Sequence, residues 1–173
     1  AIIGAGGTGG VMGYFMTKAG KDVTLIARGR HLEAMKEHGL TLERLWDPNP
    51  ETIAVKATDM EHYKEQPDVI LVCVKGYSLE DTVPFIRRVA KPDTIVIPIL
   101  NIYGTGAKMQ KKLQELLVTD GCIYVSANIC QHQRTGCVSA AWEDSADRLW
   151  SSGKDRLETG TGTDPAGFYV QCY

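Results

Sequence analysis

The feature that most constrains this chain is a glycine-rich hexapeptide near its start. It follows the apolar run Ala1 to Ile3 and leads into a stretch with helical spacing, and its residues are Gly4-Ala5-Gly6-Gly7-Thr8-Gly9. After a strand and before a helix, the first glycine of such a motif permits a tight turn, the second lets the backbone approach a pyrophosphate, and the third lets helix and strand pack closely. Free N–H groups at the helix start then attract the anion. The motif predicts a phosphate-binding loop; the alternative is a glycine-rich turn that binds nothing.

Apolar runs alternate with helical stretches from residue 1 to residue 129. The runs are short and β-branched, as in buried parallel strands: Ala1 to Ile3, Val23 to Ala27, Val69 to Val74, Thr94 to Ile99 and Cys122 to Val125. Between them, apolar residues recur three and four positions apart, as in amphipathic helices: Thr8 to Ala19, His31 to His38, Leu79 to Val89 and Lys108 to Leu117. This order predicts an α/β fold, a Rossmann-like parallel sheet with flanking helices.

One segment, Gly39 to Pro67, interrupts that alternation. It contains Leu40 to Glu43 and Thr52 to Ala57, in which apolar and polar residues alternate with a period of two. Such alternation is typical of half-exposed strands. We expect a small antiparallel insert here.

The end of the second predicted strand indicates which dinucleotide the loop would bind. NAD-specific sites usually carry Asp or Glu there for the ribose hydroxyls, whereas an Arg accommodates a 2′-phosphate. Here the strand runs into Arg28-Gly29-Arg30, with no carboxylate at its tip. The pattern favours NADPH; the alternative is a merely solvated pair of arginines.

Composition and charge narrow the partners. A net charge of −2, with Lys and Arg scattered along the chain, gives no broad basic face, so neither nucleic acid nor an anionic membrane is an expected partner. The apolar runs are far shorter than the roughly 20 residues of a membrane-spanning helix, and no secretory signal is visible at the start, which we expect to be clipped. We therefore expect a cytoplasmic protein with a small-molecule partner, and the oligomeric state stays open.

The cysteines give no metal-site pattern. There are five, Cys73, Cys122, Cys130, Cys137 and Cys172, without CxxC pairing or histidine at ligand spacing. Cys73 and Cys122 fall in predicted strands, which favours buried thiols in a reducing compartment. We expect no metal.

Four segments together resemble the ketopantoate reductase (2-dehydropantoate 2-reductase) family. They are GAGGTGG, DVTLIARGRHLEAMKEHGL, DVILVCVKGYSLEDTVP and PILNIYGTG, and the likeness covers residues 1 to 129. It implies an NADP-binding Rossmann-like domain over these residues, with the NADPH phosphates on Gly4, Ala5, Gly6, Gly7, Thr8 and Gly9 and the 2′-phosphate near Arg28.

The resemblance also implies contacts further along the chain. Lys75 matches a lysine that the family directs at the cofactor and substrate, although it could be a surface lysine after a strand. Asn101 matches an asparagine that touches both nicotinamide and substrate, but the family's Gln-Asn-Gly setting here reads Leu100-Asn101-Ile102. Ala127 matches a backbone contact to the cofactor.

The family transfers a hydride from NADPH to a 2-keto acid, giving pantoate on the route to pantothenate. A general acid must protonate the developing alkoxide, and the family supplies it as a lysine in a C-terminal helical domain. We find no counterpart of that lysine or domain, so we name no catalytic residue and expect a truncated, catalytically incomplete reductase. The alternatives are an NADP(H)-binding module or sensor without catalysis, and an unstable product without function.

Residues 130–173 differ in character from what precedes them. Only Val138, Leu149, Leu157, Phe168 and Val170 among them are Val, Leu, Ile or Phe. So few apolar residues cannot offset the entropy of ordering, which predicts a poorly structured tail. A sharper hypothesis is that this segment is translated out of frame. Residues 141–150 can be written with codons that, when the reading frame is shifted by one base, encode His-Gly-Lys-Ile-Leu-Arg-Ile-Val-Phe-Gly. That sequence resembles the family at this point. A native tail, or a splicing or assembly error, remains an alternative.

The out-of-frame hypothesis predicts a specific DNA sequence. The DNA that encodes Cys130-Gln131-His132 can also encode Ala-Asn-Ile when its reading frame is shifted by one base. These are the residues at 127 to 129, so a tandem duplication of their codons would explain both the repeat and the change of frame. We expect the encoding DNA to repeat that stretch, and sequencing it is the measurement. Codons at 127 to 132 without a repeat would rule out the duplication.

Overall fold

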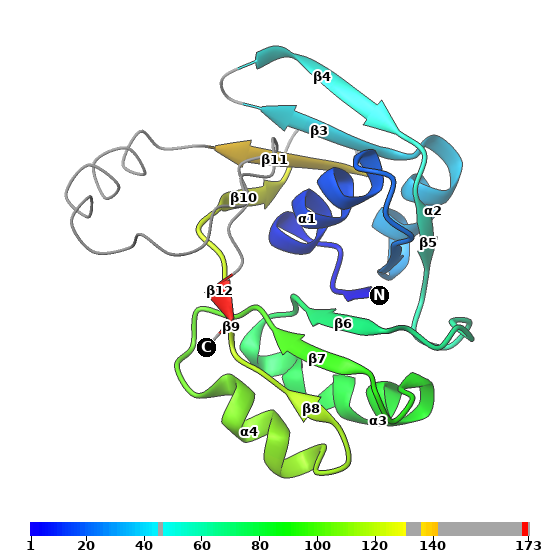
Figure 1. Cartoon of the computed structure of the whole chain (residues 1–173). Helices are drawn as coiled ribbons and strands as arrows, with labels where there is room; N and C mark the ends of the chain where they lie inside the picture. Colours follow the sequence, from blue (N-terminus) through cyan, green and yellow to red (C-terminus); the bar gives the residue numbers. More distant parts are fainter. Residues whose placement is uncertain (45–46, 131–135, 142–170, 173) are drawn as a thin grey trace, which may run out of the picture.

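The computed structural model describes residues 1–44, 47–130, 136–141 and 171–172 (Figure 1). Its main sheet has six parallel strands in the order β5-β2-β1-β6-β7-β8. The bounds are Ile2–Ile3 for β1, Thr24–Ile26 for β2, Lys56–Thr58 for β5, Val69–Val72 for β6, Ile95–Pro98 for β7 and Leu117–Val118 for β8. This is the doubly wound order, in which the chain moves outward from β1 in one direction and then from β6 in the other.

Helices cover both faces of this sheet, and the side chains of its strands alternate between them. Ile2, Leu25 and Leu71 pack on the face that carries α1 (Gly7–Lys18) and α2 (Gly29–His38). Their neighbours along the strands, among them Ile3, Ile26 and Ile70, pack on the opposite face against α3 (Leu79–Val89) and α4 (Thr105–Lys112). Because both faces are buried, the central strands β1, β2, β6 and β7 are mostly apolar, and their positions agree with the predicted ones. The Rossmann-like fold class is confirmed.

A second sheet packs on the outer side of α1. Its strands, in the order β10-β11-β3-β4, are β10 (Ser126–Ile129), β11 (Cys137–Ala141), β3 (Leu40–Arg44) and β4 (Asp47–Ile53). Leu40, Leu42 and Val138 from this sheet share one core with Val11 and Tyr14 of α1. Figure 1 shows α1 between the two sheets. A helix enclosed in this way is apolar on more than one side, as α1 is.

The predicted antiparallel insert is present as the β3–β4 hairpin, but the second predicted strand, Thr52 to Ala57, covers the end of one strand and the start of another. Thr52 and Ile53 end β4, whereas Lys56–Thr58 forms β5 at the edge of the main sheet, parallel to β2. The residues between them let the chain change sheets. Period-two alternation cannot show that change because both strands are half-exposed.

The prediction of a main-sheet strand at Cys122 to Val125 was wrong. The sixth strand of the main sheet is Leu117–Val118, and Cys122 is exposed in β9 (Gly121–Cys122), which pairs with β12 (Gln171–Cys172). The cause is an early end to α4 at Lys112, because the Gln110 side chain donates to the carbonyls of Leu113 and Leu116 and accepts from the Val118 amide. The side-chain amide of Gln110 thus makes hydrogen bonds with backbone groups that would otherwise have been paired within a longer helix.

The boundary that we placed at residue 129 falls inside the second sheet. β11, from the segment expected to be poorly structured, is parallel to β3 and antiparallel to β10, and Val138 is fully buried. Its few apolar residues suffice because α1 and β3 already provide a surface to cover. Cys130 and Cys137 form a disulfide at the end of the β10–β11 pair where β10 ends and β11 begins. The out-of-frame hypothesis rests mainly on residues 141–150, and residues 142–150 lie outside the described residues.

No helix among the described residues is long and apolar enough to cross a membrane.

Two neighbouring residues of β6 test the packing of the main sheet. Ile70 is fully buried and Val69 is 37% exposed. We expect Ile70→Ala to lower the free energy of unfolding by about 3 kcal/mol, through lost burial and a residual cavity. Val69→Ala, the matched control, is expected to cost less than about 1 kcal/mol. Urea unfolding of the three chains measures both, and equal losses would contradict the assignment of strand faces.

Candidate functional site

The site lies where the strand order reverses, at the carboxyl ends of β1 and β6. In open parallel sheets the loops after two such strands diverge and leave a crevice that binds ligands. Here the loop after β1 is the glycine-rich hexapeptide, and it touches the end of β6: a Cβ on Gly4 would lie 3.0 Å from the carbonyl carbon of Cys73. The predicted phosphate loop therefore stands at the position where this fold class binds nucleotides.

Within the loop, the first two residues face the protein and the third faces outward. Gly4 has a φ of +93°, which favours glycine, and the N–H groups of Gly4 and Ala5 donate to the carbonyl of Ile26 at 3.0 and 3.3 Å. No heavy atom lies within 4 Å of the place where a Cβ on Gly6 would stand. The start of α1, whose first N–H groups have no partner within the helix, is thus accessible beside Gly6.

The next two glycines of the loop are needed for close packing. A Cβ on Gly7 would lie 2.3 Å from the carbonyl oxygen of Ala127, and one on Gly9 would lie 2.2 Å from the carbonyl oxygen of Gly4. The first contact brings Ala127 of β10 to the loop across a large distance in sequence. The second presses α1 onto the end of β1, which aims the helix axis at the crevice.

Lys75 and Asn101 follow β6 and β7, and their loops adjoin each other. A Cβ on Gly76 would lie 2.7 Å from Cδ1 of Ile102. Lys75 precedes the short 3₁₀ helix η1 (Gly76–Ser78) and is exposed, as is Asn101. Tyr77 and Tyr103, on the same two loops, are 84% and 102% exposed. This side of the crevice is therefore open.

Arg28 stands immediately before α2, at the carboxyl end of β2, and is exposed. Neither Arg28 nor Lys75 forms an ion pair with another described residue. Two cationic side chains are thus available at the carboxyl edge of the sheet. Unpaired cations in such a position suit an anionic ligand.

Cys73 lies beneath the loop, where its thiol is poorly suited to act as a nucleophile. Burial raises the pKa of its thiol to about 12. A thiol so buried stays protonated at neutral pH, and only the thiolate is a good nucleophile. Cys73 is partly buried and Cys122 is exposed, so the expectation of a buried thiol is wrong for Cys122.

One contact of the loop was missed by the sequence analysis. His31, in the first turn of α2, has its Nε2 atom 2.7 Å from the carbonyl oxygen of Ala5. Its Nδ1 atom accepts a hydrogen bond from the Gly136 amide. No motif marks this histidine, since both partners are backbone groups that any residue type provides.

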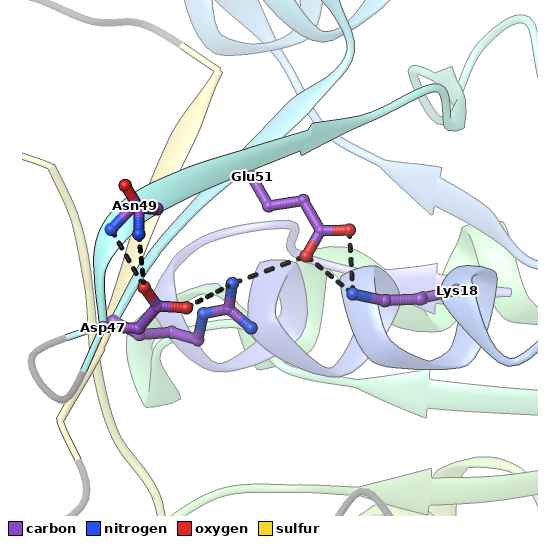
Figure 2. A network of polar contacts seen from close by, with 5 residues as sticks. Lys18, Asp47, Asn49 and Glu51 are labelled. Atoms are coloured by element: carbon purple, nitrogen blue, oxygen red, sulfur yellow. Dashed lines mark hydrogen bonds and ion pairs between the residues drawn. The ribbon is translucent and has the colours of Figure 1, made fainter.

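The other end of α1 is held by ion pairs rather than by packing alone. Glu51 of β4 pairs with Lys18 at 2.6 Å and with the guanidinium of Arg44 at 3.4 Å, and this guanidinium also reaches Asp47 at 3.1 Å. Figure 2 shows the carboxylate of Glu51 directed at Lys18. Hydrogen bonding to Lys18 is the main cause that lowers the pKa of Glu51. The network joins the hairpin to the end of the helix that is remote from the loop.

A metal site gains no support from the part of the chain that the structure describes. One group there, Glu43, Cys130 and Cys137, has three candidate ligand atoms within 4.8 Å of one another. The two cysteines are joined in a disulfide, and a metal takes thiolates.

A hollow of about 510 Å³ runs along the outer edge of β5, beside Thr24, Lys36 and Tyr63, and contains none of the predicted site residues.

An open sheet with this strand order and a glycine-rich loop at its switch point defines the class of dinucleotide-binding domains. The comparison with known families then gives the particular one. The family model described as ketopantoate reductase PanE/ApbA matches residues 1–138. The chain belongs to this family.

Individual relatives agree. A 2-dehydropantoate 2-reductase of Pyrococcus horikoshii is 34% identical over 110 residues, which are 64% of this chain and 35% of that protein. The uncharacterized oxidoreductase YkpB of Bacillus subtilis is 34% identical over 133 residues, or 73% of this chain and 41% of that protein. The crystal structure of a PanE/ApbA family ketopantoate reductase from Ralstonia eutropha JMP134 superposes with a TM-score of 0.71 at 26% identity, covering 80% of this chain and 45% of that one. The chain thus spans less than half the length of these relatives.

Two glycines of the loop make a matched test of the site's packing. Gly9→Ala places a Cβ 2.2 Å from a backbone oxygen, so we expect it to lower the free energy of unfolding by more than about 2 kcal/mol. Gly6→Ala meets open space and is expected to change stability by less than about 1 kcal/mol. Thermal unfolding followed by circular dichroism gives the comparison. A Gly9→Ala chain as stable as the original would show that α1 does not approach β1 this closely.

Proposed function

We propose that this chain binds NADPH in the crevice between β1 and β6 and is the cofactor-binding part of an enzyme that reduces 2-dehydropantoate (ketopantoate), or a related 2-keto acid, to the 2-hydroxy acid. The observation that carries the proposal is the open side of Gly6 at the start of α1, at the switch point of the sheet. A pyrophosphate needs close backbone approach and free N–H groups, and both are provided there. Membership of the ketopantoate reductase family supports the choice of reaction.

Each proposed contact has a chemical reason. Backbone N–H groups of the Gly4–Gly9 loop, above all on its open side, would donate to the pyrophosphate. Arg28, exposed at the end of β2, would pair with the 2′-phosphate of NADPH, which NADH lacks. Ala127 touches the loop beside Gly7 and would contribute backbone contact.

Lys75 and Asn101 would serve the reacting end of the cofactor. Both stand at carboxyl ends of neighbouring strands, on loops that touch through Gly76 and Ile102. An ammonium group there attracts the carboxylate of a 2-keto acid, and an amide can donate to its carbonyl oxygen. Asn101 is therefore the proposed substrate contact of this chain.

When held by the backbone of the Gly4–Gly9 loop and by Arg28, NADPH would supply the hydride for reduction of a keto carbon. The oxygen of that carbonyl would then need a proton. We assign no described side chain as the donor of that proton. Turnover would require an acid that we do not assign among the described residues, and without such an acid the proposed role is that of an NADP(H)-binding module or sensor, which is the second candidate function.

Cofactor selectivity tests the role of Arg28. We expect the chain to bind NADPH more tightly than NADH, and Arg28→Ala to weaken NADPH binding about tenfold through loss of charge-assisted hydrogen bonds while NADH binding stays the same. Arg87→Ala, which removes an exposed arginine on α3 that pairs with Glu115, is the control. Titrations followed by cofactor fluorescence measure all of these. Equal affinity for the two cofactors would contradict the 2′-phosphate assignment.

Adding ketopantoate to the NADPH-loaded chain separates the two candidate functions. We expect binding without oxidation of NADPH, since no proton donor is assigned among the residues that the structure describes. Absorbance at the reduced nicotinamide band gives the rate. Steady oxidation would show that this chain contains its own proton donor, and failure to bind NADPH would argue against both functions.

A further inference from the structure

His31 joins the proposed phosphate loop to the second sheet. It lies in the first turn of α2, between Ala5 of the loop and Gly136 of the turn before β11. Its Nε2 is 2.7 Å from the Ala5 oxygen and its Nδ1 is 3.2 Å from the Gly136 nitrogen. Both ring nitrogens are therefore engaged, and each engages a backbone group.

These two partners determine the state of the imidazole. The Gly136 amide can only donate, so Nδ1 must be the unprotonated nitrogen that accepts. The proton of the neutral ring is then on Nε2, which donates to the Ala5 carbonyl, a group that can only accept. The neutral Nε2–H tautomer satisfies both bonds; the other tautomer satisfies neither.

The bond to Ala5 also orients the next N–H group of the loop. In a planar trans peptide the C=O and the N–H point in opposite directions. Holding the Ala5 carbonyl toward His31 therefore turns the Gly6 N–H away from it. Gly6 is the residue with open space beside it, where the pyrophosphate is proposed to lie. A flipped peptide would present a carbonyl oxygen to the phosphate instead, and two partial negative charges repel.

The far anchor is rigid. Gly136 has a φ of +84°, and its carbonyl accepts from the Thr41 amide of β3 at 2.9 Å. A Cβ there would lie 3.2 Å from the Cβ of Ala34 in α2. The amide that holds His31 is thus fixed by the second sheet and by α2 together, so the position of the imidazole does not depend on the loop that it orients.

We propose that His31 is a positioning residue for cofactor binding: as the neutral Nε2–H tautomer it holds the Ala5–Gly6 peptide in the orientation that offers the Gly6 N–H to the pyrophosphate. The proposal rests on the proposed function and deepens it. His31 touches no reacting atom; it acts through the backbone of the loop.

Two variants separate its two bonds. His31→Gln keeps a donor at the reach of Nε2, whereas His31→Asn places its amide at the position of Nδ1 and cannot reach Ala5. We expect His31→Asn to raise the dissociation constant for NADPH about tenfold, and His31→Gln to stay within about threefold of the original chain. His38→Asn is the control, since His38 ends the same helix with a side chain that is 69% exposed.

Thermal unfolding without cofactor is measured on the same variants, so that a general loss of stability is recognised. A purely structural role would lower the melting temperature in step with affinity for all variants at position 31. The proposal is overturned if His31→Asn binds NADPH as the original chain does, or if His31→Gln, at an unchanged melting temperature, loses as much affinity as His31→Asn.

A measurement without cofactor keeps this inference distinct from the proposed function. Long-range ¹H–¹⁵N correlation spectra of the original chain report which imidazole nitrogen carries the proton. A protonated Nε2 and an unprotonated Nδ1 at His31 support the inference even if NADPH fails to bind, in which case the proposed function fails alone. An Nδ1–H tautomer, or a ring averaging between the two, would overturn it.

Discussion

The close approach of α1 to the end of β1 is the constraint on which the rest of the structure depends. It exists because a helix can come within contact distance of a strand's carbonyl only where no Cβ intervenes, as at Gly9 beside Gly4. The same approach brings the start of α1 to the switch point of the sheet. The packing and the proposed anion binding therefore depend on one local geometry, and a substitution that disturbs the packing is expected to disturb the binding as well.

A second layer fixes this helix from outside. α1 packs against the main sheet on one side and against Leu40, Leu42 and Val138 of the second sheet on the other. The ion pairs of Lys18 and Glu51 hold its last turn, and the contact between Gly7 and Ala127 holds its first. Exposed ion pairs contribute little to stability, at most about 1 kcal/mol each. The apolar contacts thus carry most of the stability, while the charges favour one register of the hairpin over others.

The loops on the opposite side of the crevice lack such support. Tyr77 and Tyr103 are almost fully exposed beside Lys75 and Asn101, the residues proposed for the reacting end of the cofactor. Large exposed aromatic side chains beside polar ones are typical of surfaces that bind a ligand or another protein. The glycine-rich side of the crevice is therefore closely packed, whereas the side with Lys75 and Asn101 is exposed.

By itself the sequence determined the α/β class, most strands of the main sheet, the glycine-rich loop between β1 and α1, and the place of Arg28, because these depend on local periodicity and on glycines at fixed spacing. Only the tertiary structure decided the rest. Lys56–Thr58 joins the main sheet, Gln110 ends α4 early, and β11 becomes ordered beside β3 because partners distant in sequence satisfy their backbone groups or bury their side chains. His31 became visible for the same reason: its role lies in two backbone partners, Ala5 and Gly136, and contacts to backbone leave no pattern in a sequence.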